Sequence, residues 1–142
     1  MSDKAAIRIL IIEDDLEYAG LLRLHLTAVG YAAEVAEDAV EGGKALLAHP
    51  PALVLCDISM PYLNGLDLLS LMQSDARSQS IPVVFISGHT DAETIAKAVK
   101  LGAADFLAKP ISREQLLESV AACLQVGGRK AAAPDGDLPP AL

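Results

Sequence analysis

The sequence predicts a single α/β domain built on a five-stranded parallel sheet with helices on both faces. The chain has 142 residues, 52% of them hydrophobic, which is enough for one domain with a sizeable core. Short apolar runs alternate with longer stretches that have helical spacing or helix caps. Because the links between them are short, this alternation favours parallel strands covered by the helices that connect them.

Five apolar runs are the expected strands. The first, IRILII, is rich in β-branched residues and has almost no polar interruption, which is typical of a strand buried on both faces. Pro82 lies near the start of the fourth run, where a missing N–H donor is tolerated. The expected strands are residues 7–12, 31–36, 53–56, 81–86 and 104–108.

A helix is expected after each strand. Gly30 ends the first helix, while Gly42 and Gly43 weaken the second. The expected helices are residues 16–29, 38–49, 65–74, 91–102 and 112–126. Their expected N-caps are Asp15, Asp38, Asp91 and Ser112, the last with Gln115 as its capping-box partner. Residues 1–126 are thus expected to form the domain, and the Gly-, Pro- and Ala-rich residues 127–142 a disordered C-terminal tail.

Composition excludes several classes of function. Eleven basic against nineteen acidic side chains give a net charge of −8, which argues against direct nucleic-acid binding. No apolar run approaches the roughly 20 residues that a membrane helix needs, and the N-terminus lacks signal-peptide features. The expected compartment is therefore the cytoplasm. Cys56 and Cys123 lie in apolar runs and are expected to be buried thiols.

Polar side chains gather where the expected strands end. They are Glu13 and Asp14 after the first strand, Asp57 after the third, Ser87 after the fourth and Lys109 after the fifth. In parallel α/β sheets these ends lie at one edge, where ligands bind. Adjacent carboxylates repel each other unless a cation joins them, and Mg²⁺ prefers oxygen ligands. A lysine suits phosphate, and a carboxylate can act as the nucleophile that forms an acyl phosphate.

Four segments resemble the receiver domain of two-component response regulators. They are ILIIEDD, LVLCDISMPYLNGLDLL, PVVFISGHTD and GAADFLAKP, in this order and with matching spacing. The resemblance covers residues 7 to about 126. It implies a flavodoxin-like, doubly wound (βα)5 fold with strand order 2-1-3-4-5. It also implies a phosphorylation-dependent signalling module of a two-component phosphorelay, and not an enzyme.

The resemblance also implies a role for each site residue. Asp57 would accept the phosphoryl group from a sensor histidine kinase or phosphotransfer protein. Lys109 would pair with the phosphate, and its peptide bond to Pro110 is often cis in this family. The Mg²⁺ ligands would be Glu13, Asp14, Asp57 and the backbone carbonyl of Ser59. Ser87 would be the switch hydroxyl and Phe106 the aromatic switch, and residues 92–124 would form the face that controls a downstream effector protein.

Three rival interpretations of the site fit these residues less well. A phosphatase of the haloacid-dehalogenase type would carry its nucleophile after the first strand, with a second Asp two residues on. Here the nucleophile candidate Asp57 follows the third strand, and Ser59 stands at that second position. A flavin-binding flavodoxin would need a hydroxyl-rich, phosphate-binding loop after the first strand, where this chain has acidic residues. A receiver that is never phosphorylated would not need the intact acids and Lys109. Two structural alternatives stay open: Ser87 as a turn residue and Phe106 as a core residue.

The resemblance leaves the assembly and the output open. Ala104 stands where DNA-binding members often carry an acid that serves their dimer, so we expect a monomer or a weak dimer. Residues 127–142 are too few for an output domain. If this chain is the whole natural protein, it is a stand-alone regulator that binds a partner or passes its phosphoryl group on.

Overall fold

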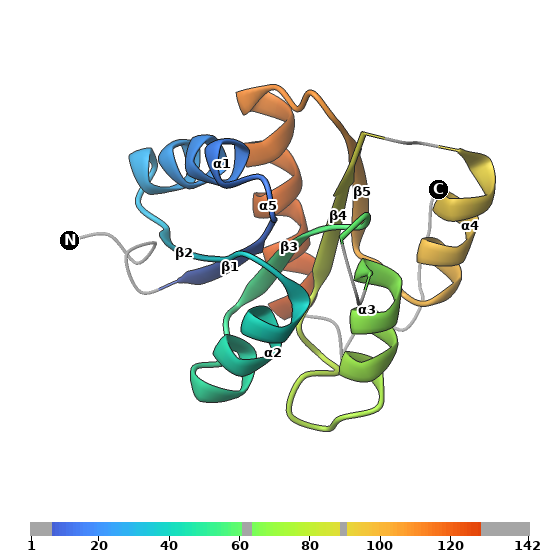
Figure 1. Ribbon diagram of the computed structural model, residues 1–142. Coiled ribbons are helices and arrows are strands. Elements are labelled where there is room, and N and C mark those ends of the chain that lie inside the picture. Colours follow the sequence, from blue (N-terminus) through green and yellow to red (C-terminus); the bar gives the residue numbers. More distant parts are fainter. Residues whose placement is uncertain (1–6, 61–63, 89–90, 129–142) are drawn as a thin grey trace.

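The computed structural model describes residues 7–60, 64–88 and 91–128. Within these residues, five strands form one parallel sheet in the order β2-β1-β3-β4-β5, with a helix after each strand (Figure 1). The strands are β1 (Arg8–Ile12), β2 (Ala32–Ala36), β3 (Leu53–Asp57), β4 (Val83–Ser87) and β5 (Asp105–Ala108). The helices are α1 (Leu16–Ala28), α2 (Ala39–Ala48), α3 (Gly65–Gln73), α4 (Ala92–Lys100) and α5 (Arg113–Gly128). The expected fold class and strand order are confirmed.

Three elements extend past their predicted ends, while several others begin later or end earlier by one or two residues. β3 and β4 each run one residue further, so Asp57 and Ser87 are the last residues of their strands. The cause is hydrogen bonding between neighbouring strands, since Asp57 pairs with Ile86 in the parallel register. Helix α5 runs to Gly128, two residues past the expected end of the domain. The remaining residues of the expected tail, 129–142, lie outside the described residues.

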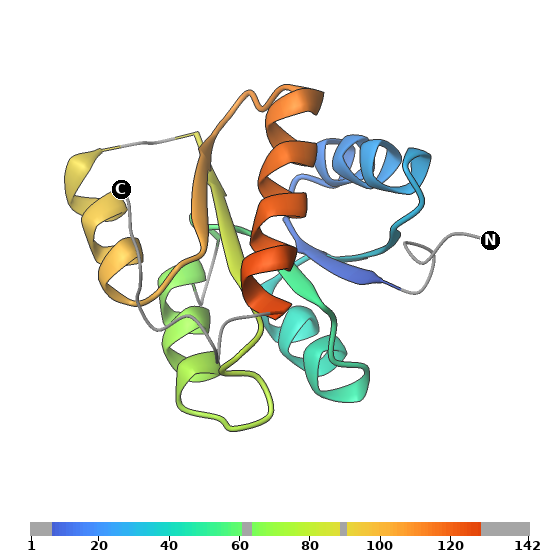
Figure 2. The ribbon, with the colours of Figure 1, turned by 180° about the vertical axis from the view of Figure 1, so that it is seen from behind.

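Two apolar cores lie on opposite faces of the sheet. Side chains alternate along each strand, so Ile9 and Ile11 face one core while Leu10 and Ile12 face the other. Helices α1 and α5 cover the first core, and α2, α3 and α4 cover the second (Figures 1 and 2). Every residue of β3 and β4 is buried. A sheet covered on both sides leaves only its strand ends open to ligands.

Side chains at the helix ends supply the predicted caps. Asp15, Asp38 and Asp91 each accept a hydrogen bond from the backbone N–H three residues on. Ser112 and Gln115 exchange two hydrogen bonds, Oγ accepting from the Gln115 N–H and Oε1 from the Ser112 N–H. These bonds satisfy backbone donors that an α-helix leaves unpaired in its first turn. Gly30, with φ of 102°, follows α1 in the left-handed conformation expected of it.

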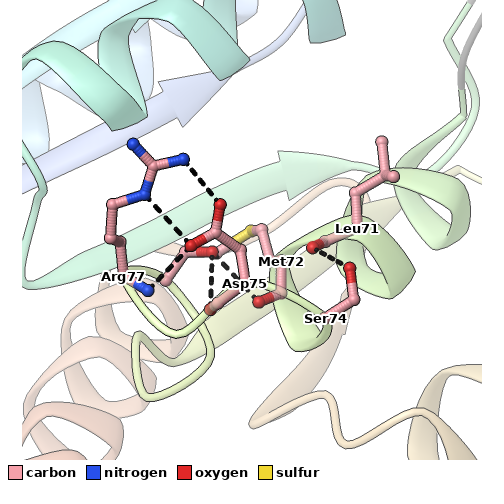
Figure 3. Close-up of polar contacts among 6 residues, drawn as sticks. Leu71, Met72, Ser74, Asp75 and Arg77 are labelled. Carbon is pink, nitrogen blue, oxygen red and sulfur yellow. Dashed lines mark hydrogen bonds and ion pairs between the residues drawn. The ribbon is translucent and has the colours of Figure 1, made fainter.

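The turn after α3 is held by hydrogen bonds to its own backbone (Figure 3). Ser74 Oγ donates to the carbonyl of Leu71 at 2.8 Å, which satisfies an acceptor at the helix end. Arg77 holds both carboxylate oxygens of Asp75, at 3.1 Å from Nε and 2.8 Å from the terminal nitrogen. These hydrogen bonds lower the pKa of Asp75 from 3.8 to about 2.

None of the helices in the described part of the chain combines the length and the apolar character needed to span a membrane.

Candidate functional site

The structure brings the predicted polar residues to the carboxyl edge of the sheet. Glu13 directly follows β1, and its backbone N–H still bonds to the carbonyl of Ala36 on the neighbouring strand. Asp57 and Ser87 are the last residues of adjacent strands, and both are buried. Lys109 directly follows β5, where its backbone N–H donates to the Ser87 carbonyl at 2.8 Å. Backbone pairing between parallel strands therefore positions the cluster.

Three carboxylates converge at this edge. One oxygen each from Glu13, Asp14 and Asp57 lies within 4.8 Å of the others. Glu13 is 0% exposed and Asp57 is 5% exposed, whereas Asp14 is open to solvent. Such a group of oxygens fits a hard divalent cation that keeps several of its waters, as Mg²⁺ does.

The ammonium of Lys109 reaches into the same cluster. Its Nζ lies 2.9 Å from Glu13 Oε1 and 3.6 Å from Asp57 Oδ2. The peptide bond between Lys109 and Pro110 is cis, in agreement with the expectation from the resemblance. A phosphoryl group on Asp57 would therefore lie within reach of a lysine already directed at that carboxylate.

Short backbone contacts orient the two buried carboxylates. The N–H of Asp15 donates to Glu13 Oε2 at 3.1 Å, and the N–H of Ser59 donates to Asp57 Oδ1 at 3.1 Å. Ser59 itself is exposed. Each carboxylate is thus held by an amide two residues further along its own loop. This leaves the second oxygen of each carboxylate facing the cluster and Lys109.

The buried carboxylate of Glu13 is only partly compensated by its neighbours. Burial raises its pKa from 4.5 to about 7, and the neighbouring Asp57 adds to the rise, while Lys109 opposes it. Oε1 of Glu13 makes the ion pair with Lys109 but accepts no hydrogen bond of regular geometry from the described residues. A buried acceptor in this condition costs free energy, and a bound cation would offset that cost. The donor set therefore fits Mg²⁺.

The two predicted switch residues lie on the neighbouring strands β4 and β5. Ser87 is buried at the end of β4. Phe106 is half-buried on β5, aligned with Phe85 of β4, and packs against the core under α2, α3 and α4.

Tyr18, which the sequence analysis did not single out, also belongs to the site. Its ring lies 4.7 Å from Lys109 Nζ, measured to the ring centroid, and its hydroxyl accepts a hydrogen bond from the N–H of Ile111 at 3.2 Å. Tyr18 lies in the first turn of α1, directly after the acidic loop. Its place next to the acidic loop is the one feature of the sequence that could have indicated a role in the site. The helix pattern itself does not distinguish Tyr18 from an ordinary half-buried aromatic residue.

Two known regulatory proteins are similar in sequence to most of this chain. The chain is 38% identical over 125 residues to the transcriptional regulatory protein RprY of Bacteroides fragilis, covering 87% of this chain and 52% of that protein. It is 38% identical over 118 residues to the Regulator of RpoS of Escherichia coli, covering 82% of this chain and 34% of that protein. The chain therefore spans about half or less of the length of these relatives.

Solved structures share the fold. The receiver domain of NtrX from Brucella abortus is 32% identical with a TM-score of 0.77, covering 82% of this chain and 98% of that one. A CheY-like receiver domain protein from Methanospirillum hungatei is 26% identical with a TM-score of 0.81, covering 87% of this chain and 98% of that one. The family model for the response regulator receiver domain matches residues 9–121. This chain therefore belongs to the response regulator receiver domain family of two-component signalling systems.

Proposed function

We propose that Asp57 of this chain accepts a phosphoryl group from a phosphohistidine of a sensor histidine kinase or phosphotransfer protein, in a Mg²⁺-dependent reaction. The observation that carries the proposal is the placement of Lys109 Nζ 3.6 Å from Asp57 Oδ2, beside the three converging carboxylates. A cation site and an ammonium at one buried carboxylate are what phosphoryl transfer to that carboxylate requires.

The transfer assigns a task to each residue. A carboxylate oxygen of Asp57 attacks phosphorus, a P–O bond forms, and the P–N bond to the donor imidazole breaks. Lys109 pairs with an oxygen of the transferred group, and the N–H of Ser59 keeps the Asp57 carboxylate oriented. Glu13, Asp14, Asp57 and the backbone carbonyl of Ser59 would hold Mg²⁺. When bound, the ion supplies positive charge that offsets the charge of the phosphoryl oxygens.

A switch would follow phosphorylation. Ser87 ends β4, the strand next to that of Asp57, and its hydroxyl would bond a phosphoryl oxygen and so stabilise one of two states. Phe106 lies on the adjoining strand and would change its packing with that state. The surface of α4, β5 and α5, residues 92–124, would then bind a downstream effector protein. The stand-alone status, the monomeric or weakly dimeric state and the cytoplasmic location stay predictions.

Labelling with a small phosphodonor tests the phosphoacceptor. Wild-type protein incubated with Mg²⁺ and acetyl phosphate should gain the mass of one phosphoryl group, and removal of Mg²⁺ with EDTA should abolish the gain. Asp57→Asn should not be labelled, whereas the exposed control Asp67→Asn should label like wild type. Equal labelling of Asp57→Asn would move the acceptor elsewhere. Steady turnover of many phosphate esters would instead favour a phosphatase.

A phosphoryl mimic tests the switch separately. Beryllofluoride with Mg²⁺ should shift the backbone amide resonances of α4, β5 and α5 in wild-type protein. In Ser87→Ala the shifts should stay confined to the residues around Asp57. Identical long-range shifts in the variant would remove Ser87 from the switch while leaving the phosphoacceptor proposal intact.

A further inference from the structure

We propose that Tyr18 is a positioning residue for Lys109, holding both its ammonium and the backbone that follows it toward Asp57. The inference rests on the proposed role of Lys109 in pairing with the phosphoryl group on Asp57. It concerns a side chain in the first turn of α1 that makes contacts with the loop between β5 and α5.

The aromatic ring supplies one of these two contacts. Lys109 Nζ lies 4.7 Å from the ring centroid of Tyr18, which is within the range in which a cation is attracted to the face of an aromatic ring. The same nitrogen faces Glu13 Oε1 at 2.9 Å and Asp57 Oδ2 at 3.6 Å. The ammonium is therefore bounded by two carboxylates and by the ring of Tyr18.

The hydroxyl supplies the other contact. Tyr18 Oη accepts a hydrogen bond from the backbone N–H of Ile111 at 3.2 Å, although 93 positions separate the two residues. Ile111 follows Lys109 by two residues, and both Tyr18 and Ile111 pack against the core beneath α1 and α5. One side chain thus holds the lysine side chain and the backbone just beyond it.

Tyr18 is itself tied to the carboxylate loop. The N-cap Asp15 accepts a hydrogen bond from the Tyr18 N–H at 3.1 Å, while the N–H of Asp15 donates to Glu13 Oε2 at 3.1 Å. A continuous series of contacts therefore runs from Glu13 through Asp15 and Tyr18 to Lys109. It couples the start of α1 to the loop after β5, so that both sides of the pocket keep their relative position.

A lysine at this position needs such support. Its long side chain loses considerable rotamer freedom when held in one geometry, and Lys109 is 23% exposed in its side chain. Removing the ring is expected to let the ammonium occupy positions directed away from Asp57. Because the attraction of a cation to an aromatic ring is modest, the labelling rate should fall by roughly three- to tenfold.

Two readouts on one set of variants test the inference. Proton NMR should show the Lys109 ε-methylene protons shifted upfield by the ring current of Tyr18 in wild type and in Tyr18→Phe, and unshifted in Tyr18→Leu. Tyr18→Phe should change the Ile111 amide resonance and speed its hydrogen exchange, because the bond to the Tyr18 hydroxyl is lost. In the labelling assay with acetyl phosphate, Tyr18→Leu should be slower than Tyr18→Phe. Tyr31→Phe, which alters the other described tyrosine at the opposite edge of the sheet, is the matched control and should leave both readouts unchanged.

A double-mutant cycle separates positioning from general damage to the fold. In a Lys109→Ala background, Tyr18→Leu should slow labelling by less than about twofold, because its effect acts through the missing ammonium. An equal slowing with and without Lys109, or Lys109 protons that show no ring-current shift in wild type, would overturn the inference. A wild-type protein that is not labelled on Asp57 would instead refute the proposed function, and the NMR comparison would still decide the placement of Lys109.

Discussion

Lys109 Nζ lies 2.9 Å from Oε1 of Glu13, a carboxylate with no exposed surface, although the two residues are far apart in the chain. Asp57 shares the same ammonium at 3.6 Å, and the described residues provide no further ion pair to either carboxylate. One positive charge therefore balances two buried carboxylates and the neighbouring Asp14. This imbalance makes the site receptive to a divalent cation and underlies the first two predictions.

The metal-free protein should lose stability as the pH rises from about 4.5 toward 7. Burial raises the pKa of Glu13 from 4.5 to about 7, so in this window the folded state retains a proton that the unfolded state has released. Deprotonation there disfavours the folded state. Thermal unfolding at a series of pH values should show a flatter dependence of Tm for Glu13→Gln, which cannot ionise. Parallel curves for the variant and wild type would contradict the prediction.

Removing Lys109 should destabilise the metal-free protein at pH 7. Lys109→Ala leaves two buried carboxylates without their cation, which should lower the free energy of unfolding by about 1–3 kcal/mol. Lys44→Ala is the control, because the Lys44–Glu41 pair is exposed and should contribute less than about 1 kcal/mol. Urea unfolding measures both variants. If Lys109→Ala lowered the free energy of unfolding as little as Lys44→Ala does, the contacts of Lys109 with Glu13 and Asp57 would be screened by solvent, and the prediction would be wrong.

Gly65 should resist substitution because of its surroundings. A Cβ at this position would lie 2.8 Å from Phe85 Cε1 and 3.0 Å from the backbone carbonyl oxygen of Asp57. Gly65→Ala should therefore cost about 1–3 kcal/mol of stability and slow the labelling of Asp57. Gly20→Ala is the control within α1, since no atom lies within 4 Å of its added Cβ. If Gly65→Ala and Gly20→Ala had the same free energy of unfolding and the same labelling rate, this account would be refuted.

The adjacent glycines of α2 should respond in opposite ways. Gly43→Ala adds a methyl group in open space within a helix and should stabilise the protein by roughly 0.5–1 kcal/mol. In Gly42→Ala the new Cβ would meet Ile12 Cδ1 at 2.5 Å, so that the gain in helix propensity is offset by displacement of a core side chain. Tm values would decide, and a higher Tm for Gly42→Ala than for Gly43→Ala would contradict the expectation.

Most of the fold could be predicted because its signals are local. Apolar runs, caps at Asp15, Asp38 and Asp91, and the stop at Gly30 all depend on neighbouring residues in the chain. The strand order came from the resemblance and is confirmed by the pairing. Local signals could not show that β3 extends to Asp57, because that residue is held by pairing with Ile86 of another strand.

The site shows the same division. The chemical groups at the strand ends could be predicted from the sequence, because they stand next to the apolar runs that form the strands: Glu13, Asp14, Asp57 and Lys109. The environments of these groups depend on the tertiary structure. Glu13 and Asp14 are adjacent acids, yet one is fully buried beside Lys109 and the other is exposed. Tyr18 reaches Lys109 only because α1 and the loop after β5, which are distant in the chain, pack together.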